Sequence, residues 1–304
     1  MKRILICGAN GLLGQRLALM LSTQDDYEVL NTSIERSFVF DNRLFDYNQL
    51  DITNRSDVKS LASSFQPDII FNAAAATNVD WCESNREEAW KANVTAVENL
   101  VDAARKVGAK LVHVSTDYVF DGKNGPYDED AKPNPIGYYG KTKLASENAL
   151  LVAGIPYVIL RTIVLYGNGI GVKANFAIWV INNLKAGKQI TVVDDQLGNP
   201  TFVGDLAMAM IKAFELNREG IFHVGGGEQL SRYDFAKRTA EVFALDSSLI
   251  KKIKTSDLKQ ASPRPMVSGF ITLKAETQLG MHFLNATEGL ALLKHELQHN
   301  GKNG

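Results

Sequence analysis

A short apolar run near the N-terminus leads directly into a glycine-rich loop, and this pairing constrains the fold more than any other feature. Residues 3–8 predict a buried strand, after which Gly8, Gly11 and Gly14 follow at GxxGxxG spacing before a helical stretch. Such glycines let backbone amides approach a pyrophosphate closely, at the positive end of the helix. A structural tight turn would also use glycines, but the position between a strand and a helix favours a dinucleotide site.

Short apolar runs alternate with helical patterns through the first half of the chain. The predicted strands are 3–8, 28–31, 68–74, 110–115 and 157–162. This alternation predicts an α/β fold with a Rossmann-type, doubly wound parallel sheet. We expect a dinucleotide-binding domain at residues 1–167, with elements returning at about 201–219. A smaller C-terminal α/β substrate-binding lobe is expected at 168–200 and 220–304.

Composition argues against several classes of partner. The chain has 33 Lys and Arg residues against 34 Asp and Glu residues, and this balance argues against binding to nucleic acid or to a membrane surface. Its two cysteines lie far apart in sequence, so we expect neither a disulfide framework nor a metal site built on cysteine. The N-terminal apolar run is too short for a signal peptide or a membrane span, which predicts a cytoplasmic location.

The end of the second predicted strand bears on the choice of cofactor. An enzyme selective for NAD usually carries Asp or Glu there, to hold the ribose hydroxyls. This chain has Asn31, then Ser33 and Arg36, and a hydroxyl with a guanidinium suits the 2′-phosphate of NADPH. Arg36 as an ordinary solvated charge is the alternative. The sequence therefore favours NADPH and leaves NADH open.

Tyr139 and Lys143 are the candidate catalytic pair. They lie four residues apart at the start of a helical stretch, so they share one helix face. The pKa of a free phenol is near ~10, and a neighbouring ammonium favours the phenolate. In a reduction, Tyr139 would give a proton to the carbonyl oxygen while the cofactor delivers hydride to carbon. The YxxxK spacing also occurs by chance on protein surfaces.

A hydroxyl at the end of the strand 110–115 strengthens this interpretation. Ligands of open α/β sheets collect beyond the carboxyl ends of the strands. Thr116 lies at that position and can orient a substrate carbonyl towards Tyr139, with Ser115 as the nearby alternative. Either residue can also serve only as part of a turn.

Several segments resemble the dTDP-4-dehydrorhamnose reductases, which are extended short-chain dehydrogenases/reductases. They are 8–14, 72–75, 115–122 and 139–143, with 193–196 and 199–201 extending the match to about residue 210. The resemblance implies an oxidoreductase that uses NAD(P)H to reduce a nucleotide-linked keto-sugar, dTDP-4-dehydrorhamnose, to dTDP-rhamnose. A homodimer is compatible with the resemblance.

The motifs and the resemblance together give a set of candidate site residues. The catalytic candidates are Thr116, Tyr139 and Lys143. The cofactor-binding candidates are Gly8, Asn10, Gly11, Leu12, Leu13, Gly14, Asn31, Ser33, Arg36, Asp51, Ile52, Ala73, Ala74, Ala75, Ser115, Tyr139, Lys143 and Thr162. The candidates facing the substrate are Thr77, Val79, Thr116, Asp117, Tyr139, Asn175, Phe176 and Gln196. No metal ligand is predicted.

One departure from the family pattern keeps alternatives open. Val164 stands where such reductases commonly carry a tryptophan, and its segment is similar to that of the regulatory beta subunit of methionine adenosyltransferase. A non-catalytic, NADP-binding regulatory role is therefore one alternative, although a regulator needs no proton donor. Another is a sugar-nucleotide epimerase or 4,6-dehydratase. Dehydratases follow the Thr-Asp dipeptide with Glu, whereas this chain has Tyr118.

Overall fold

The computed structural model describes residues 1–41 and 43–300, and a sheet of seven parallel strands lies at the centre of that part of the chain. In spatial order the strands are β11 (Gly220–Val224), β6 (Tyr157–Thr162), β5 (Lys110–Thr116), β4 (Ile69–Asn72), β1 (Lys2–Cys7), β2 (Tyr27–Ser33) and β3 (Asp46–Gln49). Every pairing within this sheet is parallel. The strand order reverses between β1 and β4, which is the doubly wound arrangement. The predicted Rossmann-type fold is confirmed.

The edge strand β11 corrects the sequence-based boundary of the smaller lobe. The sequence assigns residues from 220 onward to that lobe, but Gly220–Val224 pairs in parallel with β6. Phe222 and Val224 are fully buried in the core of the central sheet. A five-residue strand that begins with glycine is a weak sequence pattern, and only its pairing shows where it belongs. Residues 301–304 of the predicted lobe lie outside the described residues.

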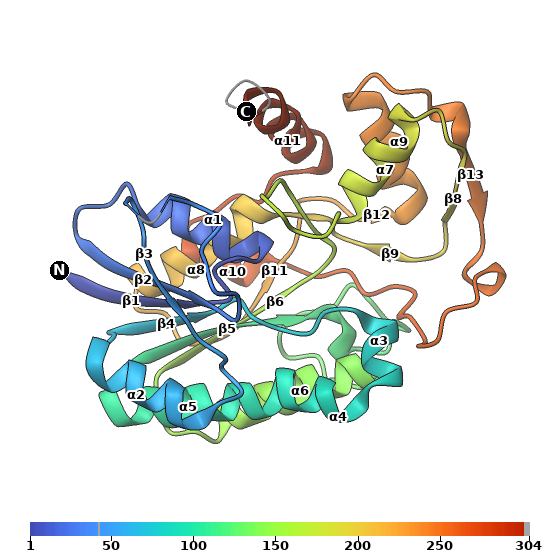
Figure 1. The fold of residues 1–304 in the computed structure, drawn as a ribbon. Coiled ribbons are helices and arrows are strands. Elements are labelled where there is room, and N and C mark those ends of the chain that lie inside the picture. Colours follow the sequence, from blue (N-terminus) through green and yellow to red (C-terminus); the bar gives the residue numbers. More distant parts are fainter. Residues whose placement is uncertain (42, 301–304) are drawn as a thin grey trace.

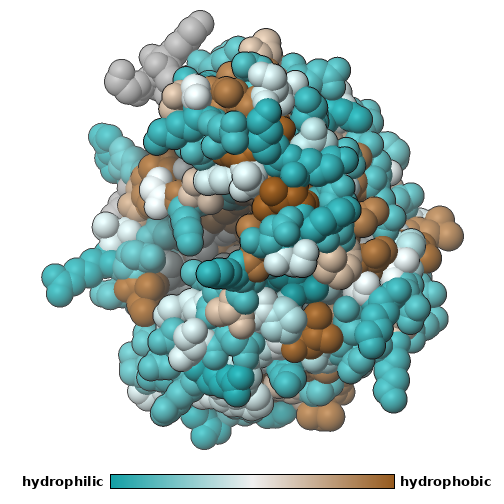
Figure 2. Space-filling view, turned by 90° about the vertical axis from the view of Figure 1, so that its right-hand side faces the viewer, coloured by the Kyte–Doolittle hydropathy of each residue, from teal (hydrophilic) through white to brown (hydrophobic). Residues whose placement is uncertain are grey.

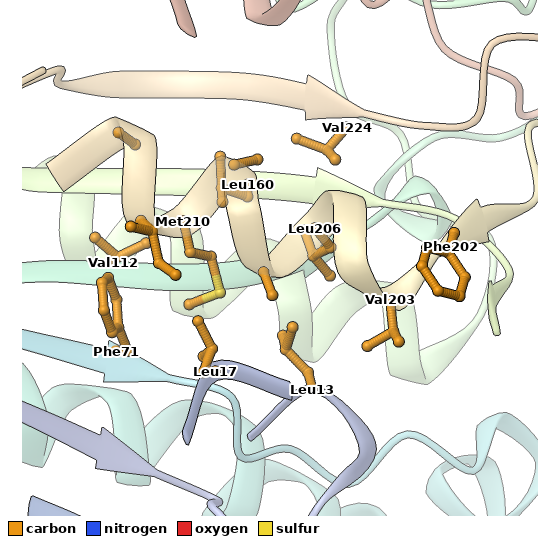
Figure 3. Close-up of a cluster of buried hydrophobic side chains, with 14 of the residues drawn as sticks. Leu13, Leu17, Phe71, Val112, Leu160, Phe202, Val203, Leu206, Met210 and Val224 are labelled. Carbon is orange, nitrogen blue, oxygen red and sulfur yellow. The ribbon is translucent and has the colours of Figure 1, made fainter. Parts of the chain in front are cut away.

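Helices cover both faces of the central sheet (Figure 1). One face carries α1 (Leu12–Leu21), α8 (Val203–Glu215) and α10 (Leu273–Leu279), and the other carries α2 (Arg55–Phe65), α5 (Ala96–Val107) and α6 (Tyr138–Leu151). Figure 3 shows how the first face is filled, with side chains of α1 and α8 lying over those of the strands. These side chains include Leu13, Leu17, Leu206 and Met210 from the helices and Phe71, Val112 and Leu160 from the strands. Burial on both faces explains why the strands are continuously apolar.

A π-helical turn links the helices on one side of the site. The chain runs through α3 (Val79–Ser84) and α4 (Arg86–Trp90) into the turn η1 (Lys91–Thr95), which continues as α5. Within η1 the Asn93 side chain accepts from the backbone N–H of Ala76 at 2.8 Å and donates to the Ala76 carbonyl at 3.0 Å. It also donates to the Thr142 hydroxyl at 3.0 Å. Asn93 therefore ties the loop after β4 to helix α6, and the candidate site lies between these two segments.

A smaller α/β lobe lies over the carboxyl edge of the sheet (Figure 1). It contains α7 (Phe176–Lys185), α9 (Arg232–Val242), α11 (Ala286–Asn300) and the parallel pair β8 (Ile190–Val193) and β13 (Ile250–Ile253). Short strands join it to the sheet region, namely β7 (Leu165–Tyr166) with β10 (Thr201–Phe202) and β9 (Leu197–Gly198) with β12 (Leu230–Ser231). Brief turns η2 (Asp117–Val119), η3 (Ser247–Leu249) and η4 (Thr255–Asp257) complete the elements. No helix in the described part of the chain is long and apolar enough to cross a membrane.

Candidate active site

A cleft of about 510 Å³ lies where the carboxyl ends of the central strands meet the smaller lobe. Figure 2 looks onto this side of the molecule and shows a hollow between its upper and lower halves. Residues from the glycine-rich loop, from the ends of β4, β5 and β6, and from α6 line the cleft. They include Gly11, Leu12, Leu13, Ala73, Ala74, Ala75, Thr77, Val79, Ser115, Thr116, Asp117, Tyr139, Lys143, Thr162 and Asn175. All of these are residues that the sequence assigned to cofactor or substrate.

The glycine-rich loop packs so closely against the loop after β4 that side chains are excluded. Gly8 has φ +83°, and a Cβ there would lie 2.7 Å from the backbone nitrogen of Ala74. Gly11 is the N-cap of α1, and neither a capping side chain nor an acidic residue occupies the first turn of that helix. The positive end of α1 is therefore directed at the cleft without a carboxylate to neutralise it, which suits a pyrophosphate.

Tyr139 and Lys143 lie side by side on α6, as their spacing predicts. Both side chains are buried, and both line the cleft. Burial raises the pKa of the Tyr139 phenol above its usual value, and the Thr116 hydroxyl partly opposes this rise. Burial also lowers the pKa of Lys143 to about 8, against the opposing charge of Glu147. The phenol of the protein alone therefore carries its proton, which is the form that can donate to a carbonyl oxygen.

The hydroxyl of Thr116 is positioned by a buried carboxyl group. Thr116 donates to Asp117 Oδ1 at 3.0 Å, and Ser268 donates to Asp117 Oδ2 at 2.6 Å. Burial raises the pKa of Asp117 to about 6, and these two hydrogen bonds oppose the rise. The hydrogen bond from Ser268 also fastens the C-terminal part of the chain to the end of β5, beside the catalytic candidates.

Two hydroxyl groups in the wall of the cleft have no hydrogen-bond partner among the described residues. They are Ser115 Oγ and Thr162 Oγ1, at the ends of β5 and β6, and both are buried. Buried hydroxyls nearly always have a partner, so unpaired ones in a cleft fit groups that a bound molecule would supply. Both residues are among the cofactor candidates from the sequence.

The comparisons with known proteins agree with this geometry. Residues 1–298 match the family model described as RmlD substrate binding domain. The dTDP-4-dehydrorhamnose reductase of Aggregatibacter actinomycetemcomitans is 36% identical over 92% of this chain and 94% of its own length. The methionine adenosyltransferase 2 subunit beta of Xenopus tropicalis is 36% identical over 87% of this chain and 78% of its own length. A Bacillus anthracis dTDP-4-dehydrorhamnose reductase, solved in complex with NADP, is similar with a TM-score of 0.87, 34% identity, and coverage of 97% of this chain and 100% of that one.

The chain belongs to the dTDP-4-dehydrorhamnose reductase family. The residues that the sequence assigned to the adenosine end of the cofactor lie outside the cleft lining, at the carboxyl end of β2. Asn31 is buried there, the Ser33 hydroxyl is hydrogen-bonded to that of Tyr47 at 2.9 Å, and Arg36 is exposed. Asn10 binds the same loop, because its side chain donates to the Ser37 carbonyl at 2.9 Å. These contacts hold the loop against the glycine-rich segment.

The remaining family candidates lie outside the lining of the cleft. Asp51 accepts from the backbone of Thr53 at 2.9 Å, and Ile52 packs against the core behind β1, so neither lines the cleft. Phe176 stacks within the smaller lobe. Gln196 lines a narrow recess that adjoins the cleft at Asp117 and Arg232. The binding roles of these residues stay predictions.

Sequence reasoning missed two charged residues that line the cleft. Arg232, the first residue of α9, lines the cleft, and its guanidinium lies 5.3 Å from the centre of the Phe176 ring. Lys173 also lines the cleft and is exposed. The local signal for Arg232 was only a helix N-terminus after Ser231. Its contribution depends on the smaller lobe folding over the sheet, which a local pattern does not reveal.

Val164, which stands where the family commonly has a tryptophan, has an unusual backbone conformation. Val164 lines both the cleft and the adjoining recess, and its φ of +46° is rare for a β-branched residue. Its carbonyl accepts from Thr201 N at 3.2 Å, which helps to hold this backbone in place. Such strain persists where the surroundings fix the conformation, and it is often found beside a binding site.

Proposed function

We propose that this protein uses NAD(P)H to reduce a nucleotide-linked keto-sugar, and specifically dTDP-4-dehydrorhamnose to dTDP-rhamnose. The observation that carries the proposal is the arrangement of Thr116, Tyr139 and Lys143 in one cleft beside the glycine-rich loop. The bound nicotinamide would supply the hydride. Tyr139 would give its phenolic proton to the carbonyl oxygen. Thr116 would turn its hydroxyl from Asp117 towards that oxygen and orient it, while Lys143 would hold the cofactor ribose and stabilise the resulting phenolate.

The test is NADPH oxidation, followed by absorbance, with dTDP-4-dehydrorhamnose and a panel of other nucleotide-linked keto-sugars. Preferential turnover of the dTDP sugar is the expected result. Turnover of another keto-sugar in the panel would keep the reaction and change the substrate. Binding of NADPH without reduction of any sugar would favour the regulatory alternative, in which the protein serves a partner enzyme; one relative is named as the beta subunit of methionine adenosyltransferase 2.

The acidic residues of the cleft argue against a 4,6-dehydratase. Among the described residues that line the cleft, Asp117 is the only carboxylic acid, and Tyr118 follows it. A dehydratase needs a second carboxylate, besides the one at Asp117, to abstract a proton from the carbon next to the carbonyl. The Tyr139–Lys143 pair does not supply it. An epimerase needs no such group, and the absorbance assay distinguishes it because an epimerase consumes no NADPH.

The choice of cofactor depends on opposing charges at the end of β2. Arg36 and Ser33 suit the 2′-phosphate of NADPH, and the relative from Bacillus anthracis was solved with NADP. The structure also brings Glu35 to this loop, where it accepts from Asn10 Nδ2 at 3.3 Å. A hydrogen bond from Ser33 holds the pKa of Glu35 below its usual value, so this carboxylate is charged. We propose that NADPH is preferred despite Glu35, with NADH as a weaker alternative.

Arg36→Ala is expected to narrow the preference for NADPH over NADH. Loss of one contact to a charged group costs about 1.5–3 kcal/mol, and the loss should fall on NADPH alone. Fluorescence titration with both cofactors measures the change. Glu35→Gln is the matched variant and should widen the preference, because it removes a repulsive charge. Equal affinities of the wild-type protein for the two cofactors would contradict the assignment.

We further propose that residues 1–167 hold the cofactor while the smaller lobe determines which sugar is accepted. Arg232 supports this division, since it brings a half-buried cation from the lobe to the cleft, where a nucleotide diphosphate would carry negative charge. We also propose a cytoplasmic location, with a homodimer as the candidate assembly and with no nucleic-acid or membrane partner. The near-even charge of the chain and the two free, buried cysteines are compatible with this proposal.

Arg232→Gln is expected to raise the KM for the nucleotide sugar about 10- to 100-fold, the usual cost of losing a charged hydrogen bond. The affinity for NADPH should stay unchanged, because that site lies on the other half of the cleft. Steady-state kinetics and a cofactor titration measure the two effects. Arg238→Gln is the control, since Arg238 lies on the same helix but contacts Glu228 and Thr287. A parallel loss of cofactor affinity in Arg232→Gln would refute the division.

A further inference from the structure

A buried histidine lies directly behind the catalytic lysine and takes no part in the proposed proton transfer. His113, on β5, has no exposed surface. Its Nε2 lies 3.1 Å from Lys143 Nζ and 3.1 Å from Ser146 Oγ, while its Nδ1 lies 3.0 Å from Asn72 Nδ2. The imidazole is thus surrounded by groups that are usually donors, and the positions of their protons can be worked out.

The orientation of Asn72 determines which ring nitrogen carries the proton. The backbone N–H of Ala74 donates to Asn72 Oδ1 at 3.1 Å, so the amide nitrogen of Asn72 is the atom that faces His113. An amide nitrogen only donates, and therefore Nδ1 of the ring accepts. Burial and the neighbouring Lys143 both lower the pKa of His113, so the ring is neutral. Its single proton is then on Nε2.

The hydrogen bonds of Ser146 agree with a proton on Nε2 of His113. They also leave Lys143 Nζ facing this N–H group. The Ser146 hydroxyl donates to the Lys143 carbonyl at 2.7 Å, so its oxygen is free to accept from the Nε2–H group. Lys143 Nζ then meets an N–H group where a lone pair would have stabilised its ammonium form. An ammonium has three donors and no acceptor, whereas a neutral amine can accept from this N–H. The contact therefore favours loss of the lysine proton.

The other charged groups near Lys143 affect its proton affinity through their charge. They do not make the contact that His113 Nε2–H makes with Nζ. Glu147, one turn further along α6, favours the ammonium, but Arg161 of β6 binds its carboxylate at 2.7 Å. Tyr139 lies one turn earlier on α6, and Asp117 lies on η2 at the end of β5. Among the groups described here, His113 is the one that presents a donor to Nζ.

We propose that His113 is a positioning residue that lowers the proton affinity of Lys143 through its Nε2–H group, and thereby sets the upper pH limit at which the cofactor is held. This inference rests on the proposed role of Lys143 at the cofactor ribose. It does not depend on which sugar is reduced. A protonated Lys143 binds the cofactor better than a neutral one, so affinity should fall as pH rises through the pKa of this lysine.

The experiment measures NADPH affinity by fluorescence between pH 6 and pH 10, without any sugar. His113→Gln replaces the donor with an amide that can turn its carbonyl oxygen towards Lys143. The pH at which affinity has fallen by half should rise by about one unit, the size of a typical neighbour effect on a pKa. Ser146→Ala removes the competing acceptor and directs the Nε2–H group fully at Lys143, so the same midpoint should fall. A residue that only fills space would alter thermal stability and leave both midpoints unchanged.

Thermal unfolding of each variant establishes that the protein is folded before titration. If His113→Gln does not fold, Ser146→Ala decides the question, because a midpoint equal to that of the wild type overturns the proposal. A downward shift in folded His113→Gln overturns it as well. Failure of the reductase assay with every sugar would reject the proposed function, but the shift in the NADPH midpoint would still be observed.

Discussion

Tyr139→Phe should lower turnover by roughly 10²- to 10⁴-fold, the usual contribution of a general acid. The phenylalanine keeps the ring and its packing beside Tyr118, whose ring centre is 5.6 Å away, but it removes the transferable proton. Folding and NADPH binding should therefore survive. Stopped-flow measurement of NADPH oxidation at saturating sugar is the appropriate assay, with cofactor titration as the measure of an intact site.

Two companion variants separate the roles of the neighbouring residues. Lys143→Met should reduce both the rate and the affinity for cofactor, because one side chain serves both. Thr116→Val should lower the rate less than Tyr139→Phe, since water can replace a single hydroxyl contact. A Tyr139→Phe enzyme with a near wild-type rate would remove Tyr139 from the chemistry and favour the regulatory alternative.

Arg161→Leu should lower the free energy of unfolding by about 3–5 kcal/mol, because it leaves the carboxylate of Glu147 buried without its partner. The two side chains are almost completely buried, and Arg161 donates to both carboxylate oxygens of Glu147, at 3.0 and 2.7 Å. A second contact, to His223 Nε2 at 3.3 Å, would also be lost. Chemical denaturation followed by circular dichroism measures the change, and the melting temperature should fall by roughly 10 °C.

The double variant Arg161→Leu/Glu147→Leu is the matched control for that prediction. Replacing both members of a buried ion pair with apolar residues is often close to neutral, so most of the lost stability should return. A single variant as stable as the wild type would mean that Glu147 is neutralised in another way. Because Glu147 also acts on Lys143, the activity of the double variant reports separately on that influence.

The parts of the fold that follow from short-range pattern were predictable from the sequence. The five predicted strands all occur in the central sheet, since continuous apolar runs bounded by polar turns are a local property. The pairing of Tyr139 with Lys143 was also predictable, because helix geometry alone places residues four apart on one face. The glycine-rich loop adopts the expected strand–turn–helix geometry for the same reason.

The features that the sequence did not reveal depend on contacts between distant segments. Glu35 and Arg36 are adjacent in sequence, and only the fold shows that Glu35 meets Asn10 of the glycine-rich loop. Arg232 reaches the cleft because α9 begins where the smaller lobe covers the sheet. The chain of contacts from Asn72 through His113 to Lys143 joins three separate elements. No periodic pattern in the sequence predicts such contacts between distant residues.

The path of the chain between the two halves limits how such a protein can evolve. After entering the smaller lobe, the chain returns to place α8 over the sheet and β11 beside β6, and it then leaves the sheet again. Cutting the chain at residue 167 would expose the edge of β6 and the apolar side chains that α8 covers. The half that we propose holds the cofactor is therefore not an independent module that could be recombined with a different lobe. A change in sugar preference has to arise by substitutions within one interwoven chain, where each must also preserve the shared core.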